Sequence, residues 1–275
     1  MSVDLHVHTT ASDGSLSPKQ VVEMASKLHL RAVAISDHDT IDGIDEALVF
    51  GKKFGIEVIP AIEFSSKYGG RDIHILGLYI DHKNSRLISS LSDLKEARSK
   101  RAEWIVGCLQ GQGFNISFNE VLEVAGNASV GRPHIARLLV KKGYVSGLSE
   151  AFTKYLKRGS LCFIEKSVYP VDRVINIIHG ASGIAIFAHP GLAHLDEFID
   201  TFIDMGLDGI EAYHAEHSKL VTEHYIELAH DKDLLVAGGS DCHGPVSTNG
   251  LRLGTVYIPD EVVDKLEEYA RERSG

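Results

Sequence analysis

The regular alternation of strand-like and helix-like segments near both ends of the chain constrains its fold more than any other feature. Residues 3–8 alternate polar and apolar side chains, and Ser17 and Pro18 then open an amphipathic helical pattern. Strands are predicted over 3–8, 31–36, 56–64, 71–80, 183–190, 209–214, 234–243 and 252–259, and helices over 18–30, 44–55, 171–180, 195–206, 219–232 and from Glu261. Strands rich in Val, Ile and Ala that alternate with helices are typical of parallel βα units, so the pattern predicts an α/β sheet or barrel.

The strand pattern disappears in the middle of the chain. Three amphipathic helices are predicted there instead, over 85–113, 117–126 and 132–143. No internal repeat and no low-complexity tract interrupts the sequence. We therefore expect one α/β domain made of residues 1–80 and 161–275, with a small all-helical insertion at 81–160.

The charge of the chain is unevenly distributed. The whole sequence has a formal net charge of −10, which argues against general adhesion to nucleic acid or to anionic membranes. Residues 81–170 nevertheless hold 14 basic and 8 acidic side chains, while the remainder holds 14 and 30. This asymmetry either marks an anion-facing segment or is ordinary variation on a solvated helical surface, and the sequence leaves both interpretations open.

Composition sets further limits on the class of protein. Hydrophobic residues make up 44% of the chain, enough for a sizeable core, and no run of about 18 or more apolar residues predicts a transmembrane helix. The N-terminal segment has no basic, apolar leader typical of a secretory signal. Cys108, Cys162 and Cys242 are scattered and form no CxxC pair. We therefore expect a reduced, cytoplasmic protein without disulfides.

Histidine is the informative residue type, because six of the fifteen histidines fall at predicted strand ends or in the loops just beyond. The carboxyl ends of parallel strands form one face of a barrel, and that face hosts active sites. Three acidic residues recur in the same places, and imidazoles gathered with carboxylates are ligands for Zn, Mn or Fe. The set comprises His6, His8, Asp13, His38, Glu63, His74, His189, Asp241 and His243.

Each of these motifs is ambiguous when taken alone. His6 and His8 share one face of a strand because side chains alternate, but a single His-x-His pair indicates a metal only weakly. The segments around His38, His189 and His243 each fit better with a histidine that is hydrogen-bonded in a loop. Their recurrence at successive strand ends is what predicts a metal site.

Five segments together resemble the motifs of the PHP (polymerase and histidinol phosphatase) domain family. They are DLHVHTTASDG, ISDHDT, IEFSS with DIHILGL, FAHP and SDCH. The resemblance covers about residues 3–80 and 171–258. It implies a distorted (β/α)7 barrel that carries a cluster of two or three metal ions and hydrolyses phosphoesters.

The resemblance also implies how the nine residues share the metals. The implied ligands are His6, His8, Glu63 and Asp241 for the first metal, Glu63, His74 and His189 for the second, and Asp13, His38 and His243 for the third. Many family members have histidine where this chain has Asp13. The third site therefore has a harder, negatively charged oxygen ligand here in place of a neutral imidazole. Mixed imidazole and carboxylate ligands favour Mn, with Fe or Zn as alternatives.

The chemistry of such a cluster suits phosphoester hydrolysis. Three divalent ions bring a charge of about +6 against three carboxylates, which leaves a cationic site for phosphate. Metals about 3.5–4 Å apart activate a bridging water and clamp the attacking and leaving oxygens. We expect attack by a metal-bridging hydroxide, with Glu63, Asp241 and His189 as the catalytic ligands. Cys242 should point away from its neighbours and serve as a small packing residue.

The GRPH segment at 131–134 supplies candidate substrate contacts. Arg132 and His134 lie at a predicted helix start, where backbone N–H groups favour anions. Arg132 could grip a phosphate with two parallel hydrogen bonds. Alternatively, Arg132 pairs with a nearby acid and His134 caps a turn. Arg158 and Lys166 are weaker phosphate candidates.

A helical insertion followed by GRPH resembles the stand-alone PHP phosphoesterases that act on nucleotides. That subgroup carries a loop ending in His-Ser, which places His217 and Ser218 as possible substrate contacts, unless His217 is a surface histidine. The resemblance implies hydrolysis of the 3′-phosphate of nucleoside 3′,5′-bisphosphates or of the 5′ ends of short RNA, and an insertion that contributes to the substrate cleft.

Two alternative functions stay open. Histidinol phosphate phosphatases and other small phosphomonoesterases share the barrel and the metals, although that branch does not typically show the helical insertion. A non-catalytic, metal-retaining binding or regulatory module is an alternative of a different class, and the presence of all nine ligands speaks against it. In each catalytic case the partner is a phosphorylated small molecule, a nucleotide or short RNA, with no membrane and no stable DNA partner implied.

Overall fold

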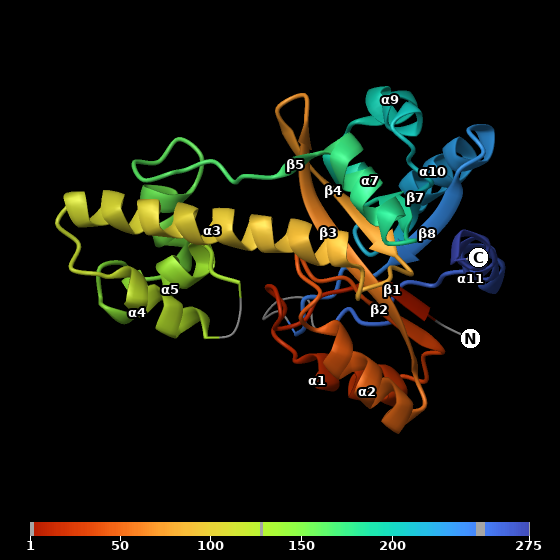
Figure 1. The fold of residues 1–275 in the computed structure, drawn as a ribbon, viewed down its shortest axis with the longest axis horizontal. Helices are drawn as coiled ribbons and strands as arrows, with labels where there is room; N and C mark the ends of the chain where they lie inside the picture. Colours follow the sequence, from red (N-terminus) through yellow and green to blue (C-terminus); the bar gives the residue numbers. More distant parts are fainter. Residues whose placement is uncertain (1–2, 127–128, 246–250, 275) are drawn as a thin grey trace. The chain divides into compact units, whose positions relative to one another are not determined.

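The structure is a computed structural model that describes residues 3–126, 129–245 and 251–274 (Figure 1). The chain divides into two compact units, residues 1–90 with 169–275 and residues 91–168. The insertion was predicted over 81–160, so its first boundary lies ten residues later because α3 begins in the first unit, and its second boundary lies eight residues later.

The first unit is built on a sheet that closes nearly into a barrel. Its strands lie in the order β1 (Val3–Val7), β2 (Ala32–Ile35), β3 (Glu57–Tyr68), β4 (Arg71–Leu78), β6 (Ile184–Phe187), β7 (Gly209–His214) and β8 (Leu235–Gly239), and β5 (Tyr169–Pro170) pairs with β3. Strand β4 is antiparallel to both of its neighbours, and the other pairs are parallel. The gap between β8 and β1 is bridged by His8 N–H, which donates to the Cys242 carbonyl at 3.0 Å. The predicted distorted barrel is confirmed.

Helices follow most strands of this unit. They are α1 (Pro18–Lys27), α2 (Ile44–Phe54), α7 (Val171–Gly180), α8 (Pro190–Ala193), α9 (Ile199–Asp204), α10 (Lys219–Asp231) and α11 (Asp260–Ser274), with a short 3₁₀ turn at Asp196–Phe198. The start of α1 is fixed by a capping box, because Ser17 accepts from Gln20 N–H while the Gln20 side chain accepts from Ser17 N–H. Apolar side chains from the strands and from α11 form one buried core that includes Val3, Leu5, Ile59, Leu76, Ile186 and Leu266.

The strand predicted over 252–259 is wrong, since residues 251–259 adopt turns and irregular structure. Gly254 lies at φ +69°, which interrupts an extended chain, and its N–H donates to the Asp4 carboxylate at 2.8 Å. The apolar alternation of this segment serves packing instead, because Ile258 is buried in the barrel core.

The second unit is helical, as predicted. It contains most of α3 (Ser85–Gly111), then α4 (Phe118–Ala125), α5 (Arg132–Lys141), α6 (Leu148–Ala151) and a π-helical turn at Phe152–Leu156. A capping box between Ser117 and Glu120 begins α4. The unit has its own core, which includes Ile105, Leu109, Ile135 and Leu139. No helix among the described residues is long and apolar enough to cross a membrane.

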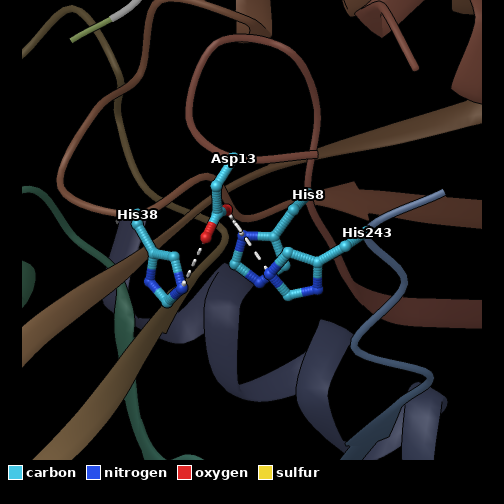
Figure 2. Close-up of side chains that lie close together, drawn as sticks. All are labelled: His8, Asp13, His38 and His243. Atoms are coloured by element: carbon cyan, nitrogen blue, oxygen red, sulfur yellow. Dashed lines mark ion pairs between the residues drawn. The ribbon is translucent and has the colours of Figure 1, made fainter. Parts of the chain in front are cut away.

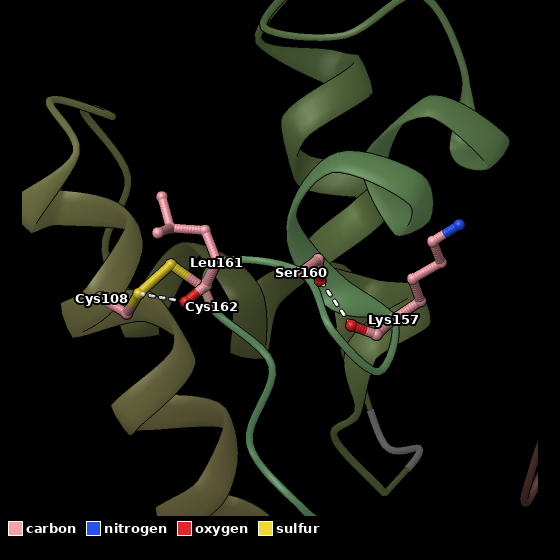
Figure 3. The surroundings of a disulfide bond; sticks show 5 residues. All are labelled: Cys108, Lys157, Ser160, Leu161 and Cys162. Carbon is pink, nitrogen blue, oxygen red and sulfur yellow. Dashed lines mark hydrogen bonds between the residues drawn. A yellow bond between two sulfur atoms is a disulfide. The ribbon is translucent and has the colours of Figure 1, made fainter.

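The prediction that the chain has no disulfide is wrong. Cys108 on α3 is bonded to Cys162, which follows the π-helical turn within the second unit (Figure 3). The two residues are 54 positions apart in the sequence, so no local spacing pattern revealed the pair. Cys242 is a free, buried cysteine, in agreement with its predicted packing role.

Candidate metal centre

The nine residues singled out in the sequence converge at one end of the barrel, where they form a single network of close contacts. Glu63, on β3, lies at its centre and is 1% exposed. Its Oε1 lies 2.9 Å from His74 Nδ1 and 3.0 Å from His189 Nε2. Its Oε2 lies 2.9 Å from His38 Nδ1 and 3.2 Å from His8 Nε2. One carboxylate therefore faces two separate groups of imidazoles, which is the arrangement of a bridging ligand.

Asp241 is the second carboxylate of the network, just after β8. Its Oδ1 lies 3.1 Å from His8 Nε2 and 3.5 Å from His6 Nε2, and the two imidazoles are 3.1 Å apart through their Nε2 atoms. Asp241 has φ +51° and His189 has φ +29°, both in the left-handed region. Backbone held in that region costs free energy in residues other than glycine and is concentrated at functional sites.

Asp13 is the third carboxylate and joins three histidines (Figure 2). Its oxygens lie 3.4 Å from His243 Nε2 and 3.8 Å from both His8 Nδ1 and His38 Nε2. The His8 and His243 rings stack with centroids 4.1 Å apart. Asp13 side-chain atoms are half exposed, so this part of the network faces solvent.

Two residues of the centre were missed in the sequence, Glu211 and His214, both on β7. Glu211 Oε1 lies 2.9 Å from His6 Nδ1, and Glu211 Oε2 accepts from His189 N–H at 2.7 Å. His214 Nε2 lies 3.6 Å from Asp241 Oδ2. His214 ends its strand, so the rule that found the other histidines also applied to it. Glu211 lies inside a strand, where no strand-end pattern indicates it.

Further buried acids fix the loops that carry the ligands. Asp37 accepts from Thr9 N–H at 2.7 Å and from the Thr9 hydroxyl at 2.7 Å, which holds the chain after β1. Asp4 accepts from Ser240 N–H at 2.8 Å and thereby fixes the segment that leads to Asp241. Asp39 accepts from Ser65 N–H at 2.8 Å within β3, two residues after Glu63. Such supporting contacts orient metal ligands before any ion binds.

The network sets the protonation of its own members. Burial raises the pKa of Glu63, but His38, His74 and His6 outweigh burial and hold that pKa well below its usual value. Burial lowers the pKa of His8, while Asp241 and Glu63 raise it overall to about 10. The Glu63 carboxylate therefore stays ionised at neutral pH, and a proton on His8 offsets part of its charge. A metal ion would displace that proton on binding.

The residues present fit a cluster of divalent metal ions. Three groups bring ligand atoms within 4.8 Å of one another, and they are His8, Asp13, His38 and His243; His6, His8 and Asp241; and His38, Glu63 and His74. Among the described residues, His8 Nδ1 and His189 Nδ1 are buried without a hydrogen bond. Buried polar atoms of this kind require a partner, and nitrogen and carboxylate donors suit Mn, Fe or Zn.

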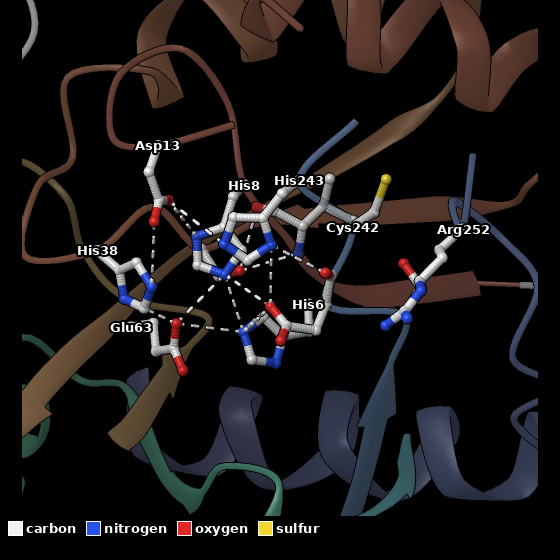
Figure 4. A network of polar contacts seen from close by, with 12 residues as sticks. His6, His8, Asp13, His38, Glu63, Cys242, His243 and Arg252 are labelled. Atoms are coloured by element: carbon white, nitrogen blue, oxygen red, sulfur yellow. Dashed lines mark hydrogen bonds and ion pairs between the residues drawn. The ribbon is translucent and has the colours of Figure 1, made fainter. Parts of the chain in front are cut away.

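Figure 4 shows that the chain after β8 brings the His243 ring beside His8 at the centre. The buried Cys242 side chain points away from the His243 ring, as expected for alternating side chains. Arg252 lies beside this segment, and its Nη1 donates to Glu216 Oε1 at 2.7 Å.

The family model of the PHP domain matches residues 4–271. The chain belongs to the PHP family. Two relatives and one solved structure share almost its whole length. A 5′-3′ exoribonuclease of Haemophilus influenzae is 37% identical over 97% of this chain and 98% of the relative. A 3′,5′-nucleoside bisphosphate phosphatase of Chromobacterium violaceum is 32% identical over 89% of this chain and 88% of the relative.

The solved structure is a protein of Bifidobacterium adolescentis named as a metal-dependent phosphoesterase. It is 33% identical, has a TM-score of 0.84, and the match covers 97% of this chain and 96% of that one. The match extends through the helical insertion of this PHP chain as well as its barrel.

The residues predicted to bind substrate are placed as follows. Arg132 begins α5, where its Nη1 donates to the Leu156 carbonyl at 2.9 Å. His134 accepts from Gly131 N–H at 3.1 Å through Nδ1 and is buried. Both belong to the second unit.

His217 and Ser218 follow β7 in the first unit. His217 Nε2 accepts from Gly191 N–H at 3.3 Å, and its Nδ1 donates to the Ala212 carbonyl at 2.9 Å. Ser218 caps α10 by accepting from Val221 N–H at 3.3 Å. The two weaker candidates lie after the π-helical turn, where Arg158 pairs with Glu165 at 3.1 Å and Lys166 follows directly.

Proposed function

We propose that this PHP chain hydrolyses phosphoesters of nucleotides, either the 3′-phosphate of a nucleoside 3′,5′-bisphosphate or the 5′ end of a short RNA. The observation that carries the proposal is the cluster of imidazoles around the three carboxylates of Asp13, Glu63 and Asp241. Full-length relatives named for these two reactions support the choice of substrate.

The nine ligand residues have distinct parts in this proposal. Glu63, Asp241 and His189 would hold the ions at the reacting phosphate, and the remaining six ligands, His6, His8, Asp13, His38, His74 and His243, complete the coordination. When bound, two to three divalent ions supply Lewis acidity and an activated water. Glu211 keeps the His6 proton on Nδ1, so that Nε2 is available as a ligand atom.

Substrate contacts are proposed for Arg132 and His134. Arg132 supports this role because a guanidinium at a helix N-terminus suits a phosphate, and the Leu156 carbonyl holds it in place. His217 and Ser218 are engaged with the backbone of their own loop and of α8. We propose that these two residues shape the loop beside the centre, and that any substrate contact they make is secondary.

Manganese is the proposed metal, since the ligand set mixes imidazoles with three carboxylates. The partner is a phosphorylated nucleotide or short RNA. The cytoplasmic location predicted from the sequence rested partly on unpaired cysteines, and the Cys108–Cys162 bond withdraws that part of its support.

A phosphate-release screen with added Mn²⁺ tests the proposal. The purified chain should be assayed with a nucleoside 3′,5′-bisphosphate, a 5′-phosphorylated oligoribonucleotide and histidinol phosphate. We expect the nucleotide or the RNA to be hydrolysed well above histidinol phosphate. Preferential release from histidinol phosphate would contradict the substrate class. Bound metal without hydrolysis of any of the three would favour a binding or regulatory module.

A further inference from the structure

His214 is a buried histidine whose two ring nitrogens have different surroundings. It ends β7, and its side chain is fully buried. Its Nδ1 accepts a hydrogen bond from Glu216 N–H at 3.1 Å. Its Nε2 is also buried, but it makes no hydrogen bond to any residue that the structure describes. A buried ring nitrogen of this kind requires a partner.

The contact with Glu216 decides which nitrogen of His214 carries the proton. A nitrogen that accepts a hydrogen bond must keep its lone pair, so Nδ1 is unprotonated. The proton of the neutral ring then lies on Nε2, which makes Nε2 a donor. A protonated nitrogen has no lone pair to give to a metal ion. His214 therefore differs from His6, whose proton lies on Nδ1 and whose Nε2 is available as a ligand atom.

The donor of His214 lies beside a carboxylate oxygen of Asp241. Asp241 Oδ2 is 3.6 Å from His214 Nε2. This separation exceeds a hydrogen bond by about 0.5 Å, so a small movement of either side chain joins the two groups. The other oxygen, Oδ1, faces His8 Nε2 at 3.1 Å and His6 Nε2 at 3.5 Å. One oxygen of Asp241 thus lies among the metal ligands while the other lies beside an N–H donor.

The His214 ring is held in place by its neighbours. Its centroid lies 5.6 Å from that of His189 and 5.1 Å from that of His217. Asp241, in contrast, follows a strand end and has φ +51°, a backbone conformation that needs support from its surroundings. All four residues belong to the first unit. A fixed ring beside a strained residue is suited to orient that residue's side chain.

We propose that His214 donates its Nε2–H to Asp241 Oδ2 and thereby turns Asp241 Oδ1 toward the metal ion that His6 and His8 would hold. His214 is then a positioning residue and not a further ligand. The inference rests on the metal centre of the proposed function, but it is independent of the identity of the substrate. Hydrogen bonds of this kind orient ligating carboxylates, and their loss weakens metal binding by about 10–100-fold.

The first test measures Mn²⁺ affinity. The full-length chain is freed of metal by chelation and titrated with Mn²⁺ against a competing chelator. His214→Leu should bind Mn²⁺ about 10–100-fold more weakly, yet take up the same amount at saturation. His214→Gln should recover most of the affinity, because its amide returns an N–H donor of similar reach. His230→Leu is the matched control, since His230 is 88% exposed on α10, and it should bind as the natural chain does.

The second test observes the proton of His214 directly in the natural chain. Nuclear magnetic resonance of the chain with ¹⁵N-labelled histidine, loaded with diamagnetic Zn²⁺, distinguishes the two ring nitrogens. The His214 signals are those that disappear in His214→Gln. We expect the proton on Nε2 and none on Nδ1. A merely space-filling histidine would not require this tautomer, and a ligand would have its proton on Nδ1.

Three results would overturn the proposal. They are a His214 proton on Nδ1 with Nε2 bonded to Zn²⁺, natural Mn²⁺ affinity in His214→Leu, and a His214→Gln variant that binds Mn²⁺ no better than His214→Leu. Circular dichroism checks that each variant folds; if His214→Leu does not, the tautomer in the natural chain decides. None of these measurements needs turnover. A chain that binds Mn²⁺ as expected but hydrolyses no nucleotide would refute the proposed function and leave the role of His214 intact.

Discussion

Glu211→Gln tests whether a buried residue behind the metal ligands controls the metal affinity of the centre. Glu211 is fully buried and its carboxylate accepts two hydrogen bonds, from His6 Nδ1 at 2.9 Å and from His189 N–H at 2.7 Å. A glutamine has the same shape but only one acceptor oxygen, and its NH₂ group must face one of these two N–H donors. The substitution therefore either forces the His6 proton onto Nε2 or displaces the His189 backbone.

Both outcomes damage a metal ligand, so the expected loss can be estimated. Replacing a partner of this kind costs about 10–100-fold in metal affinity, or about 1.4–2.7 kcal/mol. The assay dialyses the protein against buffered Mn²⁺ and measures bound metal by elemental analysis, with circular dichroism to check the fold. Glu223→Gln is the control, because Glu223 is half exposed on α10 and pairs with Lys219 of the same helix.

A Glu211→Gln variant that binds Mn²⁺ within about twofold of the natural chain and keeps its kcat/KM would refute the reasoning. Glu211 would then be a buried acid whose contact with His6 has no effect on ligation. Loss of folded structure would instead assign Glu211 to stability, which circular dichroism detects separately.

Three further predictions concern stability. Asp208→Asn should cost about 3 kcal/mol in urea unfolding at neutral pH, because Asp208 accepts from Tyr269, Arg273 and Ala185 N–H. Burial raises the pKa of Asp208, but these contacts and His179 lower that pKa overall. The stabilisation by Asp208 is therefore present above about pH 4 and is lost as the pH falls further. An unfolding free energy that differs between the variant and the natural chain by the same amount at every pH would contradict this. Reducing the Cys108–Cys162 bond, or replacing both residues by serine, should lower the unfolding free energy of the helical unit by about 4 kcal/mol, since the bond closes a loop over 54 positions. An unchanged melting temperature would contradict this stabilisation by the disulfide. Gly239→Ala should lower both melting temperature and metal content, because its Cβ would lie 2.3 Å from His6 Cβ, whereas Gly107→Ala, with nothing within 4 Å, should do neither.

Much of the metal centre could be predicted because its geometry follows from chain direction. Parallel strands end at the same edge, so histidines at strand ends such as His38 and His189 meet without any knowledge of their exact packing. Asp13 was also found by its place after the first strand, while the resemblance assigned it to the third metal; the structure brings it beside His243.

What the sequence did not reveal depends on long-range pairing. Glu211 meets His6 across 205 positions, and strands β1 and β7 are not neighbours in the sheet. The strand expected over 252–259 failed because a single glycine with positive φ outweighs an apolar alternation.

Metal-dependent phosphate release is the measurement that tests the account most directly. The natural chain and Asp241→Asn should be compared with a nucleoside 3′,5′-bisphosphate after chelation and again after adding Mn²⁺. We expect release from the natural chain only with metal, and a loss of about 10³-fold or more in Asp241→Asn with its circular dichroism preserved, since a ligand of the reacting metals is removed. Release that persists after complete chelation, or an Asp241→Asn variant as active as the natural chain, would contradict a metal centre built on these carboxylates.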